Sequence, residues 1–319
     1  MAVLVGIDEA GYGPILGPLV VSSSAFSLPN DLLKSDLWQV LRKSLSDRRS
    51  RLAGRLLISD SKKAYSRSLG IKHLERTTLT LLKCLGKEPA TLAELIGLLC
   101  PDCLGRLSEY PWYADVGTYR LATDAGDRGI ASGVFADDMA SNGIALLTMK
   151  SCCFDVAHYN TMVAAVRNKS KVLFSATSHL IKRAYDDFGG DDLHIVVDRQ
   201  GGRVHYRQNL QLMFGDTQLK ILRESPETSS YELKADGRRM RVHFVVRADK
   251  RFLPVSLASM VSKYLRELLI DNINRYFTGF NSSLRPTAGY WQDGLRFVKE
   301  IETNLPHVKF NSSQLIRSR

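Results

Sequence analysis

The feature that most constrains the fold is a pair of adjacent acids between two apolar runs near the start of the chain. Asp8 is the last residue of the first run, over 3–8, and Glu9 follows it. A turn rich in glycine and proline then leads into the second run, over 18–26. Apolar runs separated by such a turn are typical of a β-hairpin. We therefore expect two paired strands with the acids at the rim of a buried sheet.

These two acids are open to two interpretations. Adjacent carboxylates at the rim of a buried strand repel each other and lose hydration, and a divalent cation would balance their charge. The alternative is an ordinary turn with solvated acids. The glycines that follow, Gly11, Gly13 and Gly17, let the backbone approach a bulky ligand closely.

Composition narrows the class of protein. The 319 residues are 44% hydrophobic, which is ample for a core, and 44 basic against 33 acidic side chains give a formal charge of +11. This excess favours a polyanionic partner such as nucleic acid or an anionic membrane surface. No apolar run approaches the roughly 18 residues of a membrane-spanning helix, and no secretory signal is present. We expect a soluble, cytoplasmic protein.

The cysteines suggest a reducing compartment, because five is an odd number and a low density for a disulfide scaffold. Cys100 and Cys103 have half of a zinc-site spacing, and Cys152 and Cys153 are candidates for the remaining ligands. Neighbouring cysteines suit one tetrahedral metal poorly. Buried thiols are the favoured interpretation.

The rest of the chain predicts alternating helices and strands. Helical spacing of apolar residues marks 70–85, 156–188, 255–277 and 292–303, and β-branched or alternating runs mark strands at 194–198, 218–223, 229–235 and 239–247. Asp236-Gly237 is a strong two-residue hairpin signal. Prolines and glycines break 86–145 into short pieces that look inserted. We expect one domain over residues 1–319 with this insertion.

Two further acids also follow strand-like runs. Asp198 ends the predicted strand 194–198, and Asp249 follows the second strand of the Asp-Gly hairpin. Taken singly, each is more often a solvated strand end. Together with Asp8 and Glu9 they form a set of hard oxygen ligands that suits two Mg²⁺ ions and the hydrolysis of a phosphodiester.

At this point the sequence resembles the type 2 ribonucleases H, which cut RNA in RNA–DNA hybrids or at ribonucleotides embedded in DNA. The motifs that carry the resemblance occur in the family's order: Gly6-Ile-Asp8-Glu9-Ala-Gly11-Tyr-Gly13-Pro14, Asp60-Ser-Lys62-Lys63, Val197-Asp198, Ala248-Asp249 and Ala258-Ser-Met-Val-Ser-Lys263. The resemblance implies an α/β, ribonuclease H-like mixed sheet flanked by helices, with the segment 86–145 as a mostly helical insertion. It implies Asp8, Glu9, Asp198 and Asp249 as catalytic ligands of two Mg²⁺ or Mn²⁺ ions.

The resemblance also implies residues that bind the substrate. The family senses the ribose 2′-hydroxyl with the backbone of its Gly-x-Gly turn and with a tyrosine, here Gly11-Tyr12-Gly13 and Tyr290. Two positions depart from the family pattern, since Tyr12 stands where typical members have arginine and Trp291 replaces a proline. The alternative role for Tyr290 is packing.

Basic residues suit the same interpretation. Lys62, Lys63 and Lys263 match family positions near the substrate backbone. Lysines that neutralise phosphates would bind nucleic acid without reading its sequence. The leading hypothesis is thus a metal-dependent endoribonuclease. The alternatives are a nucleic-acid-binding module that does not cut and a DNA-structure nuclease without ribonucleotide specificity.

Overall fold

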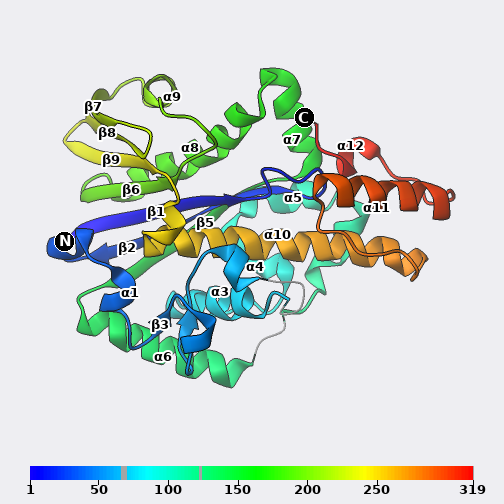
Figure 1. The fold of residues 1–319 in the computed structure, drawn as a ribbon, viewed down its shortest axis with the longest axis horizontal. Helices are drawn as coiled ribbons and strands as arrows, with labels where there is room; N and C mark the ends of the chain where they lie inside the picture. The colour runs from blue at the N-terminus through cyan, green and yellow to red at the C-terminus, as the bar shows by residue number, and fades with distance from the viewer. Residues whose placement is uncertain (66–69, 122–123, 319) are drawn as a thin grey trace.

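The computed structural model describes residues 1–65, 70–121 and 124–318, and its centre is a seven-stranded sheet in the order β5-β2-β1-β6-β9-β8-β7 (Figure 1). The strands are β1 (Ala2–Ala10), β2 (Leu19–Leu28), β5 (Ala145–Phe154), β6 (Asp192–Asp198), β7 (Gln218–Glu224), β8 (Thr228–Ala235) and β9 (Arg238–Val245). Two short strands, β3 (Leu45–Ser46) and β4 (Leu56–Leu57), form a separate parallel pair. The expected mixed sheet flanked by helices is confirmed.

Helices cover both faces of this sheet. They are α1 (Leu37–Val40), α2 (Ser61–Ala64), α3 (Lys72–Cys84), α4 (Leu92–Leu99), α5 (Leu104–Leu107), α6 (Ala125–Ser141), α7 (Val156–Val166), α8 (Lys169–Phe188), α9 (Arg207–Met213), α10 (Leu253–Phe280), α11 (Trp291–Asn304) and α12 (Ser312–Leu315). Short 3₁₀ turns, η1 to η5, lie at Asn30–Lys34, Arg49–Arg51, Pro101–Cys103, Pro111–Gly117 and Ala248–Lys250. Within this part of the chain, no helix is both long and apolar enough to cross a membrane.

The first strand is buried on both faces, which explains its nearly continuous apolar sequence. Val3, Val5 and Ile7 pack into a core shared with α8, whereas Leu4 packs on the opposite side, in the core built around α10. β1 pairs antiparallel with β2 and parallel with β6, and β6 pairs parallel with β9. The expected hairpin of the first two strands is confirmed.

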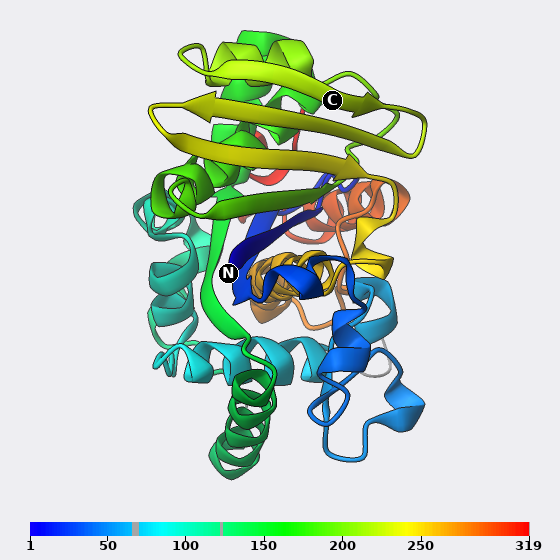
Figure 2. The ribbon, with the colours of Figure 1, turned by 90° about the vertical axis from the view of Figure 1, so that its left-hand side faces the viewer.

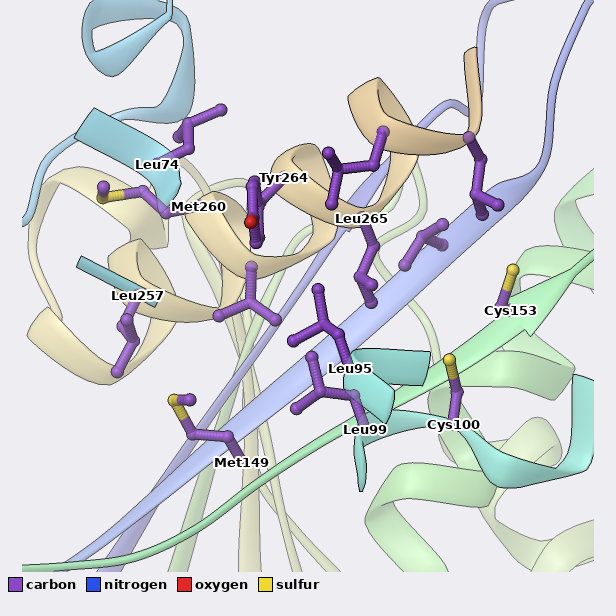
Figure 3. Close-up of a cluster of buried hydrophobic side chains, with 14 of the residues drawn as sticks. Leu74, Leu95, Leu99, Cys100, Met149, Cys153, Leu257, Met260, Tyr264 and Leu265 are labelled. Atoms are coloured by element: carbon purple, nitrogen blue, oxygen red, sulfur yellow. The ribbon is translucent and has the colours of Figure 1, made fainter. Parts of the chain in front are cut away.

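The long helix α10 lies against the sheet, and Figure 2 shows it almost end-on below the strands. On its other side α10 contacts α3 and η4, and α6 packs against α3. Leu265 of α10 points toward Leu95 and Leu99 of α4 (Figure 3). The expected helices at 70–85, 255–277 and 292–303 correspond to α3, α10 and α11.

The described part of the segment 86–145 is mostly helical, as expected, but it is not uniformly fragmented. α6 is a single helix of 17 residues, and the Asp124 side chain accepts hydrogen bonds from the Gly126 and Asp127 amides to cap its start. Its three glycines do not break the helix as expected, because tertiary packing tolerates them.

Strand β5 was missed by the sequence analysis. Its sequence, ALLTMKSCCF, has no clear alternation or flanking turn signal, and it becomes a strand because it pairs antiparallel along the whole of β2. A partner distant in sequence supplies these hydrogen bonds, so local propensity does not predict them.

The single helix predicted over 156–188 is wrong. Arg167 adopts a left-handed conformation with φ of 47° and ends α7, and the Asn168 side chain accepts a hydrogen bond from the Ser170 amide at 2.9 Å to start α8. Both helices present apolar faces to the same core, so the apolar spacing continues across the break.

The predicted hairpin at Asp236-Gly237 is confirmed. Both residues have positive φ, 48° and 74°, as a two-residue turn with the twist of paired strands requires. The neighbouring β7 lies at the edge of the sheet.

The cysteines are all free thiols. Cys100 Sγ and Cys103 Sγ lie 3.6 Å apart, and Cys153 is buried beside them. Over the described ranges, no three cysteine, histidine or acidic side chains are grouped so that they could hold a metal ion. The favoured interpretation as buried thiols is consistent with this arrangement.

A partly buried histidine on β9 makes folding sensitive to acid. His243 Nδ1 lies 2.9 Å from Ser230 Oγ, its ring stacks on His194, and burial together with the charges of His194 and Arg241 lowers its pKa to about 4. The unfolded chain therefore binds a proton that the folded chain rejects, so this contribution to stability is full above about pH 6.5 and is lost as pH falls toward 4.

We expect His243→Gln to lose less stability on acidification than the wild type does. The difference should be roughly 2 kcal/mol between pH 7 and pH 4.5, measured by urea unfolding at both values. Parallel stability losses in the two proteins would contradict the assignment.

Candidate active site

The predicted acids lie at one end of three strands that run in the same direction. β1, β6 and β9 are mutually parallel, and Ile7 stands opposite Val197, so Asp8 and Asp198 are the next residues on neighbouring strands. Asp249 lies in η5, four residues after β9 ends. Ligand sites in parallel sheets form where the carboxyl ends of strands meet, and this is such an edge.

A hydrogen bond ties two of these acids together. Arg247 takes a left-handed conformation with φ of 53°, which turns the chain from β9 into η5. The Ala248 amide then donates to Asp198 Oδ1 at 2.6 Å. The residue next to Asp249 thus holds the carboxylate of Asp198.

Asp8 is buried, with 7% of its surface exposed. The Glu9 amide donates to Asp8 Oδ1 at 2.7 Å, and the Ser262 hydroxyl of α10 donates to the Asp8 carbonyl at 3.0 Å. Burial first, then repulsion from Glu9 and Asp198, raises the pKa of Asp8 well above its ordinary value, while a hydrogen bond from the Ser259 side chain opposes the rise.

The other three acids are perturbed in the same direction. Burial and the charge of Asp198 raise the pKa of Glu9 to about 7. Burial, opposed by the Ala248 amide, raises the pKa of Asp198 to about 6, and Asp249 adds to that rise. The pKa of Asp249 is raised by burial and by Asp60. The pKa of each acid is raised by the charge of at least one other acid. The structure therefore gathers them into one electrostatic cluster.

The chemistry of this donor set fits a divalent cation. Several carboxylates that are buried and repel one another hold excess negative charge, which a hard cation would neutralise. In the part of the chain that is described, the side chains do not converge on one point as a finished metal site.

The glycine loop, residues 11–17, lies beside the acids and is held by a distant segment. Gly11 has φ of +92°, and a side chain there would meet the Pro18 carbonyl at 2.6 Å. The Ile15 and Leu16 amides both donate to the Gly289 carbonyl, at 2.8 and 3.2 Å. This contact places Tyr290, which follows Gly289, next to the glycine loop.

The two tyrosines predicted to bind substrate are both partly accessible. Tyr290 is 51% exposed and its ring centroid lies 5.8 Å from the Arg266 guanidinium carbon. Tyr12 has the Lys169 ammonium 5.2 Å from its ring centroid, and its pKa is raised by burial, Tyr159 and Glu9.

The three predicted lysines differ in their surroundings. Lys62 and Lys63 are exposed on α2, and the charge of Lys62 lowers the pKa of both Glu9 and Asp249. Lys263 is only 11% exposed, its ammonium lies 2.6 Å from Glu267 Oε1, and it faces the ring of Tyr65. Only the first two present free charge to a ligand.

Some residues of this site were not predicted. Asp60 caps α2 by accepting from the Lys62 amide at 2.9 Å, and its effect on Asp249 makes it a fifth nearby acid. Its place directly before Ser-Lys-Lys was an available signal. Arg317 donates to the carbonyls of Gly11 and Pro14, and nothing in the local sequence marks it.

No protein-family model matches the chain, and no curated protein matches it in sequence. The structure is similar to a chain of the PCNA–RNase HII complex from Archaeoglobus fulgidus, with 17% identity and a TM-score of 0.48, over 99% of this chain and 94% of the other. It is also similar to ribonuclease H2 from Pyrococcus horikoshii OT3, with 14% identity and a TM-score of 0.47, over 98% and 92%.

A third similar structure is Bst-RNase HIII in complex with Mn²⁺, with 11% identity and a TM-score of 0.42, over 99% of this chain and 66% of the other. These neighbours belong to the family that the sequence motifs resemble.

Proposed function

We propose that this protein is a metal-dependent endoribonuclease that cuts RNA in RNA–DNA hybrids or at ribonucleotides embedded in duplex DNA. The observation that carries the proposal is the cluster of buried, mutually repelling acids at the ends of β1, β6 and η5, beside the glycine loop. Structural ion pairs do not explain these acids, because their raised pKa values reflect repulsion and burial.

Asp8, Glu9, Asp198 and Asp249 would hold two divalent ions, Mg²⁺ or Mn²⁺, which when bound activate water and neutralise charge on a phosphodiester. Hydrogen bonds hold two of these four acids. The Ala248 amide fixes one oxygen of Asp198, and the Ser259 hydroxyl and Glu9 amide fix the carboxylate of Asp8. Fixed ligands reduce the reorganisation needed for catalysis.

The substrate would lie across the glycine loop and α2. Backbone amides of Gly11, Tyr12 and Gly13 would contact the ribose 2′-hydroxyl, which distinguishes RNA from DNA, and Tyr290 would flank it. Lys62 and Lys63 are exposed and would pair with backbone phosphates, with Lys263 as a further predicted contact. The protein would act on nucleic acid in the cytoplasm.

The whole chain would work as one catalytic unit. Leu92, Leu95 and Leu99 of the segment 86–145 pack in the same core as α10, which carries Ser259 and Ser262. Removal of this segment would therefore expose the helix that supports Asp8.

The test is cleavage of a DNA duplex with one ribonucleotide, run with Mg²⁺ and Mn²⁺ separately, beside an all-DNA duplex and an RNA–DNA hybrid. We expect cuts only where ribonucleotides occur, with 3′-hydroxyl and 5′-phosphate ends, and no cleavage when EDTA removes the metal. Binding in a gel shift without cutting would favour a binding module. Equal cleavage of the all-DNA duplex would favour a DNA-structure nuclease.

A further inference from the structure

A buried arginine lies beneath the glycine loop. Arg317 belongs to the segment after α12 and donates from Nη2 to the carbonyls of Gly11 and Pro14, which precede it by 306 and 303 positions. Its own amide donates to the Ile15 carbonyl at 2.8 Å, and Leu16 forms a β-bridge with Ile316. Four contacts therefore join the two segments, and Figure 1 shows them side by side.

The charge of Arg317 is poorly compensated. The residue is 4% exposed, and burial together with the charge of Arg266 lowers the pKa of its guanidinium to about 10. Among the described groups that act on this pKa there is no carboxylate; the one favourable partner is Tyr159, whose ring centroid lies 4.8 Å away. A buried cation without an acid is costly, so a stability role alone does not account for it.

Arg266 approaches the same loop from α10. Its Nη2 donates to the Ala288 carbonyl at 2.9 Å, and its side chain fills the space that a side chain at Gly11 would need. The glycine loop therefore lies between two buried guanidinium groups.

This geometry sets the direction of a particular amide. In a planar trans peptide the C=O and the next N–H point in opposite directions. Because the Gly11 carbonyl accepts from Arg317, the Tyr12 N–H points away from Arg317. An amide so directed is available to an oxygen of a bound ligand.

We propose that Arg317 is a positioning residue that holds the Tyr12 amide, and with it the glycine loop, in the orientation that recognises the ribose 2′-hydroxyl. This inference rests on the proposed function and deepens it. Arg317 itself touches no substrate. Its buried charge also favours electron-rich oxygen atoms at the outer side of the loop.

The experiment compares Arg317→Gln and Arg317→Lys with the matched control Arg76→Gln. Arg76 also holds a loop, by donating to the Gly54 and Arg55 carbonyls, but it lies on α3 away from the acids. Four quantities would be measured for each variant: steady-state kinetics on the single-ribonucleotide duplex, binding to an all-DNA duplex, amide hydrogen exchange of residues 11–17 without substrate, and metal-induced stabilisation by thermal melting.

We expect Arg317→Gln to lower kcat/KM for the single-ribonucleotide duplex about tenfold to a hundredfold, since misdirected hydrogen bonds cost that much in specificity. Exchange of the loop should accelerate, while binding to an all-DNA duplex and metal-induced stabilisation should not change. Arg317→Lys keeps the charge but not the planar guanidinium. Its kcat/KM and loop exchange should lie between those of the wild type and those of Arg317→Gln. Arg76→Gln should behave as the wild type in all four measurements.

Wild-type kinetics and loop exchange in a folded Arg317→Gln protein would overturn the inference. If this variant does not fold, Arg317→Lys decides between the same two outcomes. If the wild type cuts no substrate, the proposed function fails by itself. Faster loop exchange in the variant would then still support the positioning of the loop, and unchanged exchange would overturn that as well.

Discussion

Asp8→Asn is expected to lower kcat by about a thousandfold while the fold is kept. Metal ligation contributes several kcal/mol to the stability of the transition state, and a thousandfold loss corresponds to about 4 kcal/mol. Cleavage of the single-ribonucleotide duplex in Mg²⁺ measures the loss. The asparagine still accepts the Glu9 amide through its oxygen, so that hydrogen bond survives.

The same substitution should make the protein more stable when no metal is present. Burial and the charges of Glu9 and Asp198 oppose ionisation of Asp8, and a neutral amide removes that repulsion. We expect a higher melting temperature in EDTA and a smaller stabilisation by Mg²⁺ or Mn²⁺ than in the wild type. A substitution that raises stability while it removes activity is typical of a functional site.

Asp124→Asn is the matched control, because it makes the same chemical change at the exposed start of α6. Asp124 is not among the groups that shift the pKa values of the four acids. Asparagine remains a good helix cap, so activity and melting temperature should stay near the wild-type values. Full cleavage by Asp8→Asn under these conditions would reject the metal-ligand assignment.

The second large effect is expected at Gly6, where the fold leaves no room for a side chain. A Cβ atom there would lie 2.1 Å from the carbonyl carbon of Pro254 and 2.2 Å from the amide nitrogen of Val255, both backbone atoms at the start of α10. Backbone atoms cannot move aside as a flexible side chain can. Gly6→Ala should therefore cost more than about 3 kcal/mol, a large part of typical stability.

Urea unfolding of Gly6→Ala beside Gly97→Ala would measure this cost. Gly97 lies on the exposed face of α4, and nothing lies within 4 Å of a Cβ placed there. The control should gain up to about 1 kcal/mol, because alanine favours a helix over glycine. A Gly6→Ala protein as stable as the wild type would show that α10 does not press on β1 as described.

The contact at Gly6 also links the fold to the candidate active site. It brings α10 onto β1 two residues before Asp8, so that Ser259 and Ser262 reach the acid. A small shift of this helix would move both hydroxyls. Activity in the region of Asp8 therefore depends on a packing contact that carries no chemistry of its own.

Several parts of the molecule followed from local sequence. Apolar runs on either side of a turn predicted the hairpin of β1 and β2. Residues that accept positive φ predicted the turn at Asp236-Gly237, and the helical spacing of apolar residues predicted α10. The four predicted acids follow strand-like runs for the same reason. Their roles as metal ligands stay a prediction.

Other parts were decided only in three dimensions. β5 is a strand because β2 supplies its hydrogen bonds, and the break at Arg167 is invisible in apolar spacing because both helices face one core. Arg317 reaches Gly11 across 306 positions. Local sequence determined most of the strands, turns and helices, because those preferences act over a few residues. The tertiary structure decided which side chains meet, because contacts between distant segments depend on how the whole core packs.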